Sequence, residues 1–315
     1  VPGMGGTGSQ RSFQDNALAL QEIRIVPSFL RDSVEPDTGI ELFGRHLEHP
    51  ILGAPMTGAG TNLKDALSER ELALGMLRAF RDAGSIGWVG DGASLGKFPT
   101  ILDALEQVDG FGVLICKPRE DTAEILRRMQ DAASAGVVAV GLDIDAVAFR
   151  TMQLRGQKGI ARGMEAIAAI REKVSIPFIL KGILNPMDAE RAARAGVDYI
   201  VVSNHGGRVM DQAPGAARVL QEVADAWKQG GGAPGSVLAD GGVRSGSDAY
   251  KYLALGATAV LVGRPSVIAL AGGGEPALRF MVQSYRRQLE NTMNLCGNAT
   301  SDSIGSATVR YEEKA

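Results

Sequence analysis

Residues 236–265 read SVLADGGVRSGSDAYKYLALGATAVLVGRP, and the order of elements in this stretch decides the fold. A short apolar run at 236–240 ends in Asp240 and two glycines. A segment with apolar residues at helical spacing follows at 247–255, and a second apolar run lies at 259–263. Both runs are apolar throughout, as is typical of parallel strands covered on both faces. The stretch therefore predicts a strand–loop–helix–strand unit.

The same unit repeats outward from this stretch over most of the chain. Six earlier apolar runs bring the number of predicted strands to eight, and they lie at 51–55, 86–89, 112–116, 137–143, 177–183 and 199–203. Helical patterns separate them at 67–83, 121–133, 163–173, 187–195 and 215–227, and an amphipathic segment at 277–295 is the predicted eighth helix. Eight such repeats in about 215 residues predict an α/β fold, a (β/α)₈ barrel.

A doubly wound sheet is the rival fold. It normally carries a G-x-G-x-x-G fingerprint after its first strand, and MTGAG at 56–60 lacks that spacing. We therefore expect one domain over residues 1–315. The barrel covers about 50–295, an extension at 1–49 contains a helix at 16–24, and a polar tail at 296–315 packs on the barrel or on a neighbouring subunit.

Composition excludes several classes of partner. The net charge of the 315 residues is −3 and no basic stripe occurs, so we expect neither nucleic acid nor an anionic membrane as partner. No apolar run reaches the roughly 18 residues of a membrane span. Residues 1–10 lack the apolar core of a signal peptide, and the absence of an initial Met leaves open whether residues precede Val1.

The cysteine and histidine counts predict reduced thiols and no metal. Cys116 and Cys296 are interpreted as free thiols of a cytoplasmic chain rather than as a disulfide. Three histidines and two separated cysteines do not have the spacing of zinc ligands.

Charged residues follow five consecutive predicted strands. The reactive groups of such barrels lie at the carboxyl ends of the strands, where this sequence places Asp143, Asp145, Lys181, His205, Arg208, Asp240, Arg244 and Arg264. Lys181 comes directly after three large apolar residues. A buried ammonium group there requires an anionic partner or a lowered pKa.

The loops after the last two strands predict a phosphate site. Gly241 and Gly242 allow the backbone to approach a ligand closely and to present N–H groups. Arg244 and Arg264 offer bidentate contacts to a dianion. The alternative is that the two glycines merely turn the chain.

Two motifs resemble those of the FMN-dependent 2-hydroxy acid oxidases and dehydrogenases, a family that includes glycolate oxidase, lactate oxidase and mandelate dehydrogenase. SNHGGRVMD at 203–211, followed by Pro214, is similar to the family's active-site motif, and 238–265 is similar to its FMN-phosphate segment. Lys181 stands where the family has its flavin-contacting lysine. The resemblance extends from about residue 12 to 292.

The resemblance implies that FMN lies across the barrel mouth. It assigns cofactor contacts to Pro55, Met56, Lys181, Ser203, Asp240, Gly241, Gly242, Arg244, Gly263 and Arg264. Asp240 would hold the ribityl hydroxyls, and the charge of Lys181 would stabilise the reduced, anionic flavin.

The resemblance also implies the catalytic roles. His205 removes a substrate proton, Arg208 binds the substrate carboxylate, and Asp143 orients the histidine, with Asp145 as the competing choice. Arg150 matches a second substrate arginine of some members. A hydride equivalent then passes from the 2-carbon to flavin N5 and leaves a 2-keto acid. The electron acceptor, oxygen or a carrier, stays open, and the family favours a homotetramer.

The chain departs from the family at two tyrosines and one loop. One tyrosine position falls on Pro2-Gly3-Met4-Gly5 and the other, on the third strand, aligns with Leu114. We therefore expect a more apolar site and a 2-hydroxy acid bulkier or more unusual than glycolate. The segment between Asp143 and Lys181 is short, which predicts a more open mouth.

Two other functions compete with 2-hydroxy acid oxidation. FMN-dependent isopentenyl diphosphate isomerases resemble this barrel but lack the His-Gly-Gly-Arg turn that His205 begins. A flavin-binding subunit without catalysis is the other alternative, because both tyrosines are missing.

Overall fold

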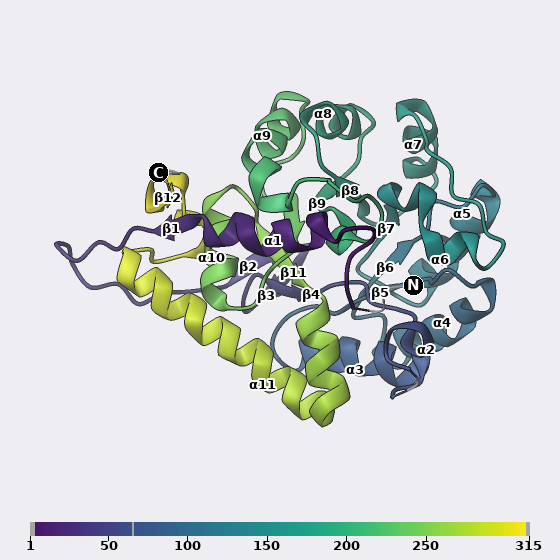
Figure 1. Cartoon of the computed structure of the whole chain (residues 1–315), viewed down its shortest axis with the longest axis horizontal. Helices are drawn as coiled ribbons and strands as arrows, with labels where there is room; N and C mark the ends of the chain where they lie inside the picture. Colours follow the sequence, from purple (N-terminus) through teal and green to yellow (C-terminus); the bar gives the residue numbers. More distant parts are fainter. Residues whose placement is uncertain (1–3, 65, 313–315) are drawn as a thin grey trace.

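The eight predicted strands form one closed parallel sheet in the computed structural model, which describes residues 4–64 and 66–312. The strands are β4 (Ile51–Gly53), β5 (Trp88–Gly90), β6 (Val113–Cys116), β7 (Ala139–Asp143), β8 (Phe178–Ile183), β9 (Tyr199–Val202), β10 (Val237–Asp240) and β11 (Ala259–Val262). Their order is β4-β11-β10-β9-β8-β7-β6-β5. The barrel closes between β4 and β5, the two ends of this order, because the N–H of Gly53 donates at 3.0 Å to the carbonyl of Ile86, two residues before β5. Figure 1 shows the strands gathered at the centre of the molecule.

Helices surround this barrel. They are α2 (Ala59–Asn62), α3 (Glu69–Arg81), α4 (Phe98–Glu106), α5 (Thr122–Ser134), α6 (Arg150–Gln153), α7 (Met164–Arg171), α8 (Pro186–Arg194), α9 (Ala216–Gln229), α10 (Gly246–Ala254) and α11 (Arg264–Cys296). The sequence patterns missed α2, α4 and α6. Helix α11 begins at Arg264 rather than at residue 277, because the backbone is non-helical at Gly273 and Gly274 and this break hides the first part of the pattern.

Short 3₁₀ helices occupy several connections. They are η1 (Leu95–Lys97), η2 (Ile144–Ala148), η3 (His205–Gly207), η4 (Ser301–Ser303) and η5 (Ser306–Thr308). Two of them, η2 and η3, directly follow strands β7 and β9 at the carboxyl end of the barrel and carry the polar residues described below.

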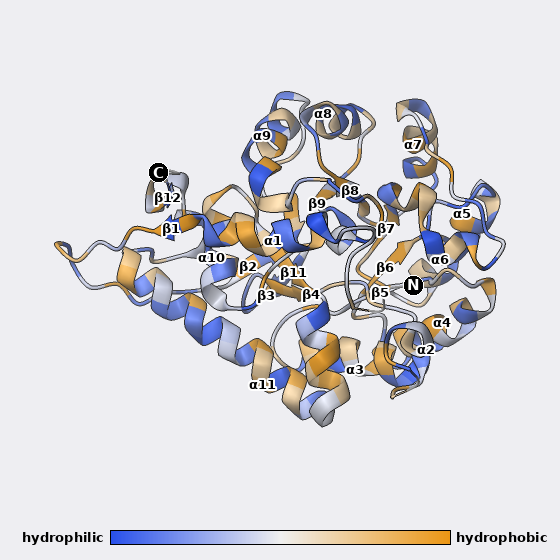
Figure 2. Ribbon diagram, in the orientation of Figure 1, coloured by the Kyte–Doolittle hydropathy of each residue, from blue (hydrophilic) through white to orange (hydrophobic). Residues whose placement is uncertain are grey.

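Two apolar layers form the core. Alternate strand residues point into the barrel or outward to the helices, so on β6 Val113 and Ile115 belong to the inner cluster while Leu114 and Cys116 pack with the helices. In Figure 2 the hydrophobic colour gathers on the central strands. Both cysteines are buried free thiols. Within residues 4–64 and 66–312 no helix is long and apolar enough to cross a membrane.

A β-hairpin covers the amino end of the barrel. Strands β2 (Ile40–Leu42) and β3 (Arg45–Leu47) pair antiparallel. Between them, the ring of Phe43 packs against Trp88, with centroids 6.0 Å apart, and against Tyr199 at 4.6 Å. With this end filled by side chains, the opposite end of the barrel is the one that can open to ligands.

The C-terminal tail packs on the N-terminal extension beside the barrel. Helix α1 (Arg11–Gln21) begins five residues before the predicted helix at 16–24. Strand β1 (Ile23–Ile25) pairs antiparallel with β12 (Val309–Tyr311), so the tail packs on the N-terminal extension of its own chain (Figure 1).

His49 joins the first barrel strand to the end of helix α3 and is fully buried. Its Nε2 lies 2.9 Å from the carbonyl of Ala83, and its Nδ1 accepts the N–H of Ile51 at 3.3 Å. A neutral ring satisfies both contacts, whereas a second proton on Nδ1 would break the contact with Ile51. Burial, with a smaller contribution from the charge of Arg286, lowers the pKa of His49 to about 4.

We predict that His49 makes stability depend on pH. The folded protein binds this proton more weakly than the unfolded chain, so the unfolding free energy falls as the pH drops from about 6.5 to 4, by about 3 kcal/mol in all. In His49→Gln the loss between pH 7 and 4.5, measured by urea unfolding, should be about 2 kcal/mol smaller than in the parent. The exposed His46, changed to Gln, is the matched control. Equal losses in the parent and in His49→Gln would contradict the prediction.

Candidate active site

A cavity of about 1160 Å³, including the part that opens to solvent, lies at the carboxyl ends of the strands. Residues at the ends of several strands from β4 to β11 line it, which is where barrels of this kind bind their ligands. Twelve of the predicted site residues line it: Pro55, Met56, Asp143, Lys181, His205, Arg208, Asp240, Gly241, Gly242, Arg244, Gly263 and Arg264. The structure thus brings together residues that are more than 200 positions apart in the chain.

The turn after β9 presents His205 to the cavity. Three consecutive residues have positive φ, at 56° for His205, 62° for Gly206 and 73° for Gly207. A Cβ on Gly206 would lie 2.6 Å from Nη1 of Arg264, and one on Gly207 would lie 2.4 Å from the backbone N of Phe13. Gly207 is therefore required by close packing against the backbone as well as by conformation, and Gly206 by its conformation. His205 itself adopts a backbone conformation that is uncommon outside glycine.

The N-terminal extension holds this turn in place. The amide nitrogen of the Asn16 side chain, on α1, donates to Oδ1 of Asn204 at 2.8 Å, and the same oxygen accepts the N–H of Gly207. The N–H of Thr7 donates to the carbonyl of Gly207 at 2.8 Å. A segment outside the barrel therefore fixes the position of the catalytic candidate.

Asp145 determines which nitrogen of His205 carries the proton. Nδ1 of His205 lies 2.8 Å from Oδ1 of Asp145. Because a carboxylate accepts but does not donate, Nδ1 carries a proton, and in the neutral form of the ring Nε2 holds the lone pair. Asp145, the competing choice of the sequence analysis, therefore accepts the hydrogen bond of His205, whereas Oδ1 of Asp143 lies 3.6 Å from Nδ1. The chain turns into η2 directly after Asp143, and this turn brings Asp145 under the ring.

Asp143 instead binds two lysines. Its Oδ2 accepts a hydrogen bond from Nζ of Lys117 at 2.5 Å, and its Oδ1 lies 3.5 Å from Nζ of Lys181. Burial alone would raise the pKa of Asp143, but the positive charges of Lys117 and Lys181, and of the His205 ring when it is protonated, outweigh burial and hold this pKa well below its usual range. Asp143 is therefore ionised throughout the neutral range.

Lys181 has the anionic partners that its buried position requires. Its Nζ lies 3.3 Å from Oδ2 of Asp240 and donates to Oγ of Ser203 at 3.0 Å. Burial would lower the pKa of Lys181, but the carboxylates of Asp240 and Asp143 outweigh burial and raise it above its usual value. Ser203 does not line the cavity. Its Oγ also accepts the N–H of His205 at 3.0 Å, so Ser203 links the lysine to the histidine turn.

The residues after β10 and β11 fit the phosphate and polyol of FMN. Oδ1 of Asp240 is buried without a hydrogen-bond partner within the described chain, as expected of an acceptor for ligand hydroxyls. Gly241 and Gly242 have φ of 107° and 79°. Burial, together with the nearby positive charges of Arg208 and Arg244, lowers the pKa of Arg264 to about 10. A dianionic group would relieve this repulsion among the arginines.

The third barrel strand differs from our expectation. Leu114 points toward the helices and does not line the cavity. The residue that does line it is Lys117, directly after β6, which we missed. Inward positions alternate along β6 through Val113 and Ile115, and this alternation extended by two residues would have indicated Lys117. The expectation of a more apolar site is therefore wrong at this strand. Of the other tyrosine position, Pro2 and Gly3 lie outside the described residues.

Arg208 reaches the cavity, whereas Arg150 does not. Arg208 lies over the ring of Phe149, with its guanidinium carbon 5.0 Å from the centroid. Arg150 is exposed and lies outside the cavity, because α6 points it away. Phe149, Thr151 and Arg155 of the same short segment line one wall instead.

A metal ion is a poor fit to the acidic cluster beside His205. Ligand atoms of Asp143, Asp145 and His205 lie within 4.8 Å of one another. The ammonium groups of Lys117 and Lys181 already contact Asp143, however, and would repel a cation.

A family model and several curated relatives match nearly the whole chain. The model of FMN-dependent dehydrogenases matches residues 4–166 and 156–311. The chain is 33% identical to a 4-hydroxymandelate oxidase of Amycolatopsis orientalis over 96% of this chain and 90% of that protein. It is 32% identical to a peroxisomal (S)-2-hydroxyacid oxidase of Arabidopsis thaliana (98% and 91%) and 31% identical to an L-lactate oxidase of Alicycliphilus denitrificans (95% and 88%).

Solved structures agree with these matches. A crystal structure of mandelate oxidase superposes with a TM-score of 0.82 at 30% identity, covering 96% of this chain and 90% of that one. A variant of mandelate oxidase with an FMN adduct has a TM-score of 0.78 at 32% identity, covering 96% and 92%.

We predict that Arg264→Met weakens FMN binding about 10- to 100-fold, because one charged hydrogen-bond donor to the phosphate is lost. The dissociation constant is measured by quenching of FMN fluorescence on titration with the apoprotein. Arg279, exposed on α11, changed to Met serves as the control. An unchanged dissociation constant in Arg264→Met, with normal thermal unfolding of the apoprotein, would place the phosphate elsewhere.

Proposed function

The chain belongs to the FMN-dependent dehydrogenase family, and we propose that it oxidises a small L-2-hydroxy acid to the corresponding 2-keto acid. One observation carries the proposal: His205, whose Nδ1 is held by Asp145, and Arg208 line the same cavity as the residues that fit FMN. Family membership favours this oxidation over the isomerase and over a non-catalytic flavin subunit.

His205 and Arg208 act on different groups of the substrate. Arg208 binds the carboxylate, which places the 2-carbon beside His205. Nε2 of His205 takes the proton of the 2-hydroxyl group, and the hydrogen on the 2-carbon leaves with two electrons. The carboxylate of Asp145, 2.8 Å from Nδ1, stabilises the imidazolium that forms.

FMN, when bound, supplies the two-electron acceptor for that hydrogen. Pro55, Met56 and Gly263 would contact it from the first and last strands, and Gly242, Arg244 and Arg264 would hold its phosphate. Lys181 keeps its positive charge among Asp143 and Asp240 and would stabilise negative charge that develops on the cofactor.

The relatives support a substrate with a side chain larger than that of glycolate and oxygen as the electron acceptor. Their names specify 4-hydroxymandelate, 2-hydroxy acids and lactate, and all three are named oxidases. We test the substrate with a panel of L-2-hydroxy acids added anaerobically to the flavin-loaded protein, with bleaching near ~450 nm as the readout. Readmission of air then separates an oxidase, which regains its colour at once, from an enzyme that requires an electron carrier.

We further propose a cytoplasmic homotetramer. The two buried free thiols suit a reducing compartment. Phe29 and Leu30 are largely exposed on the connection between β1 and β2 and suit a contact between subunits. Light scattering of the purified protein measures the subunit number, and cell fractionation tests the location.

We predict that His205→Ala lowers the rate of flavin reduction by the best acid of the panel at least about 100-fold, because the proton acceptor is lost. Bound FMN per chain should stay the same, since the predicted phosphate contacts come from other residues. His46→Gln, on the exposed hairpin, should reduce flavin at the parental rate. An unchanged rate in flavin-replete His205→Ala would refute the assignment of the base.

A further inference from the structure

Lys117 is a buried cation in the cavity that the proposed function does not use. Its Nζ lies 2.5 Å from Oδ2 of Asp143, 3.5 Å from Nε2 of His205 and 4.8 Å from the ring centroid of Phe149. Of its three N–H groups, the hydrogen bond to Asp143 occupies one and the longer contact with Nε2 of His205 a second. One donor of Lys117 therefore remains for a ligand, and a ligand that binds Nε2 frees another.

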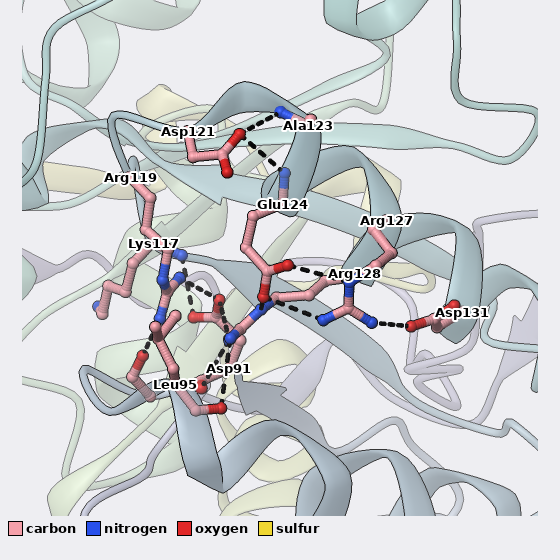
Figure 3. Close-up of polar contacts among 11 residues, drawn as sticks. Asp91, Leu95, Lys117, Arg119, Asp121, Ala123, Glu124, Arg127, Arg128 and Asp131 are labelled. Atoms are coloured by element: carbon pink, nitrogen blue, oxygen red, sulfur yellow. Dashed lines mark hydrogen bonds and ion pairs between the residues drawn. The ribbon is translucent and has the colours of Figure 1, made fainter. Parts of the chain in front are cut away.

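A buried ion network fixes the backbone that carries Lys117. The N–H of Lys117 donates to Oδ1 of Asp91 at 3.0 Å. Asp91 is fully buried and binds the guanidinium groups of Arg119 and Arg128, and Arg128 also binds Glu124 at 2.7 Å (Figure 3). The network ties the ends of β5 and β6 to helix α5. The network holds the backbone of Lys117 and the hydrogen bond to Asp143 holds its ammonium group, so Lys117 is a preorganised donor.

Nε2 of His205 and Nζ of Lys117 together determine which chemical group can bind between them. Nε2 of His205 accepts a hydrogen bond, because Nδ1 holds the ring proton for Asp145. Nζ of Lys117 donates. A group that contacts both must donate one hydrogen bond and accept another. A hydroxyl group can do this, whereas an ionised carboxylate has no proton to give to Nε2.

We propose that Lys117 binds the oxygen on the 2-carbon of the substrate while Arg208 binds the carboxylate. This inference rests on the proposed function and names a further specificity-determining residue for it. As the hydroxyl proton moves to Nε2, negative charge grows on that oxygen, which becomes the carbonyl oxygen of the product. The ammonium group stabilises this charge more strongly than it stabilises the neutral hydroxyl, and it keeps its own protons.

The contact between Lys117 and the substrate oxygen predicts which acids of the same carbon skeleton the site prefers. An acid without oxygen at the 2-carbon leaves Nζ without its partner, and a site that binds a hydroxyl discriminates strongly against such an analogue. A 2-amino acid would place its ammonium group against Lys117, where like charges repel. The site therefore selects 2-hydroxy and 2-keto acids over 2-deoxy and 2-amino acids.

The test compares Lys117→Met with the parent protein in the flavin-loaded state. Benzoylformate and phenylacetate differ only by the oxygen at the 2-carbon, as do pyruvate and propionate. Dissociation constants come from the ligand-induced change in flavin absorbance, without turnover. In the parent, the keto acid should bind at least ten-fold more tightly than its deoxy partner. In Lys117→Met that preference should fall to less than two-fold, with the affinity for the deoxy acid unchanged.

The rate of flavin reduction provides a second readout. Lys117→Met should lower the rate with (S)-mandelate or L-lactate about 100-fold, the effect of removing one such donor. Lys158→Met removes an exposed lysine, paired with Glu120 outside the cavity, and should match the parent in both assays.

A double variant separates substrate binding from a structural role of Lys117. If Lys117 only neutralises Asp143, then Lys117→Met with Asp143→Asn removes both charges and should recover the keto preference; the rate is not a readout for this variant, because Asp143 also contacts Lys181. If Lys117 binds the oxygen, the double variant stays as defective as Lys117→Met. Recovery in the double variant, or a parent protein that binds keto and deoxy acids alike, would overturn the proposal. Failure of every 2-hydroxy acid to reduce the parental flavin contradicts the proposed function instead, and the binding comparison still decides the role of Lys117.

Discussion

The carboxylate of Asp143, buried between the ammonium groups of Lys117 and Lys181, is the interaction on which the site depends. Isolated charges are costly to bury, and each of these three is tolerated because the others are present. Together they place two positive charges in one wall of the cavity, where the proposed oxidation would develop negative charge. The network extends through Ser203 to the His205 turn and through Asp240 to the cofactor loops. Removing any member would leave an uncompensated charge in the centre of the site.

Segments outside the barrel give this network its precision. The turn at His205 has a strained backbone, and such a turn persists only where its surroundings hold it. Helix α1 and the residues before it provide that support through Asn16 and Thr7. On the opposite side of the mouth, Asp91 and its arginines fix the end of β6. His205 and Lys117 are therefore held by two different sets of contacts.

The site carries a positive charge at the end of the third strand, where the sequence predicts an apolar residue in place of the family's tyrosine hydroxyl. An ammonium group stands at the end of the third strand, and its counterion Asp143 is shared with the lysine beside the cofactor loops. In the proposed function, this one carboxylate would couple substrate binding at Lys117 to electrostatic support of the cofactor by Lys181. Arg155 and Thr151 on the short segment after β7 complete the wall that faces Arg208.

The sequence by itself determined the repeat of strands and helices, the glycine-containing loops at the cavity and the placement of His205 and Arg208 on one turn, because these depend on local periodicity and on residues close together in the chain. It did not determine which of Asp143 and Asp145 contacts the histidine, that Arg150 faces away, or that Lys117 and not Leu114 enters the cavity. Each of those depends on side-chain direction at a strand end, where a shift of one residue reverses the face. Only the tertiary structure brought Asp91, Lys117, Asp143 and His205 together, because their contacts join four different strands and balance charges that local sequence cannot pair.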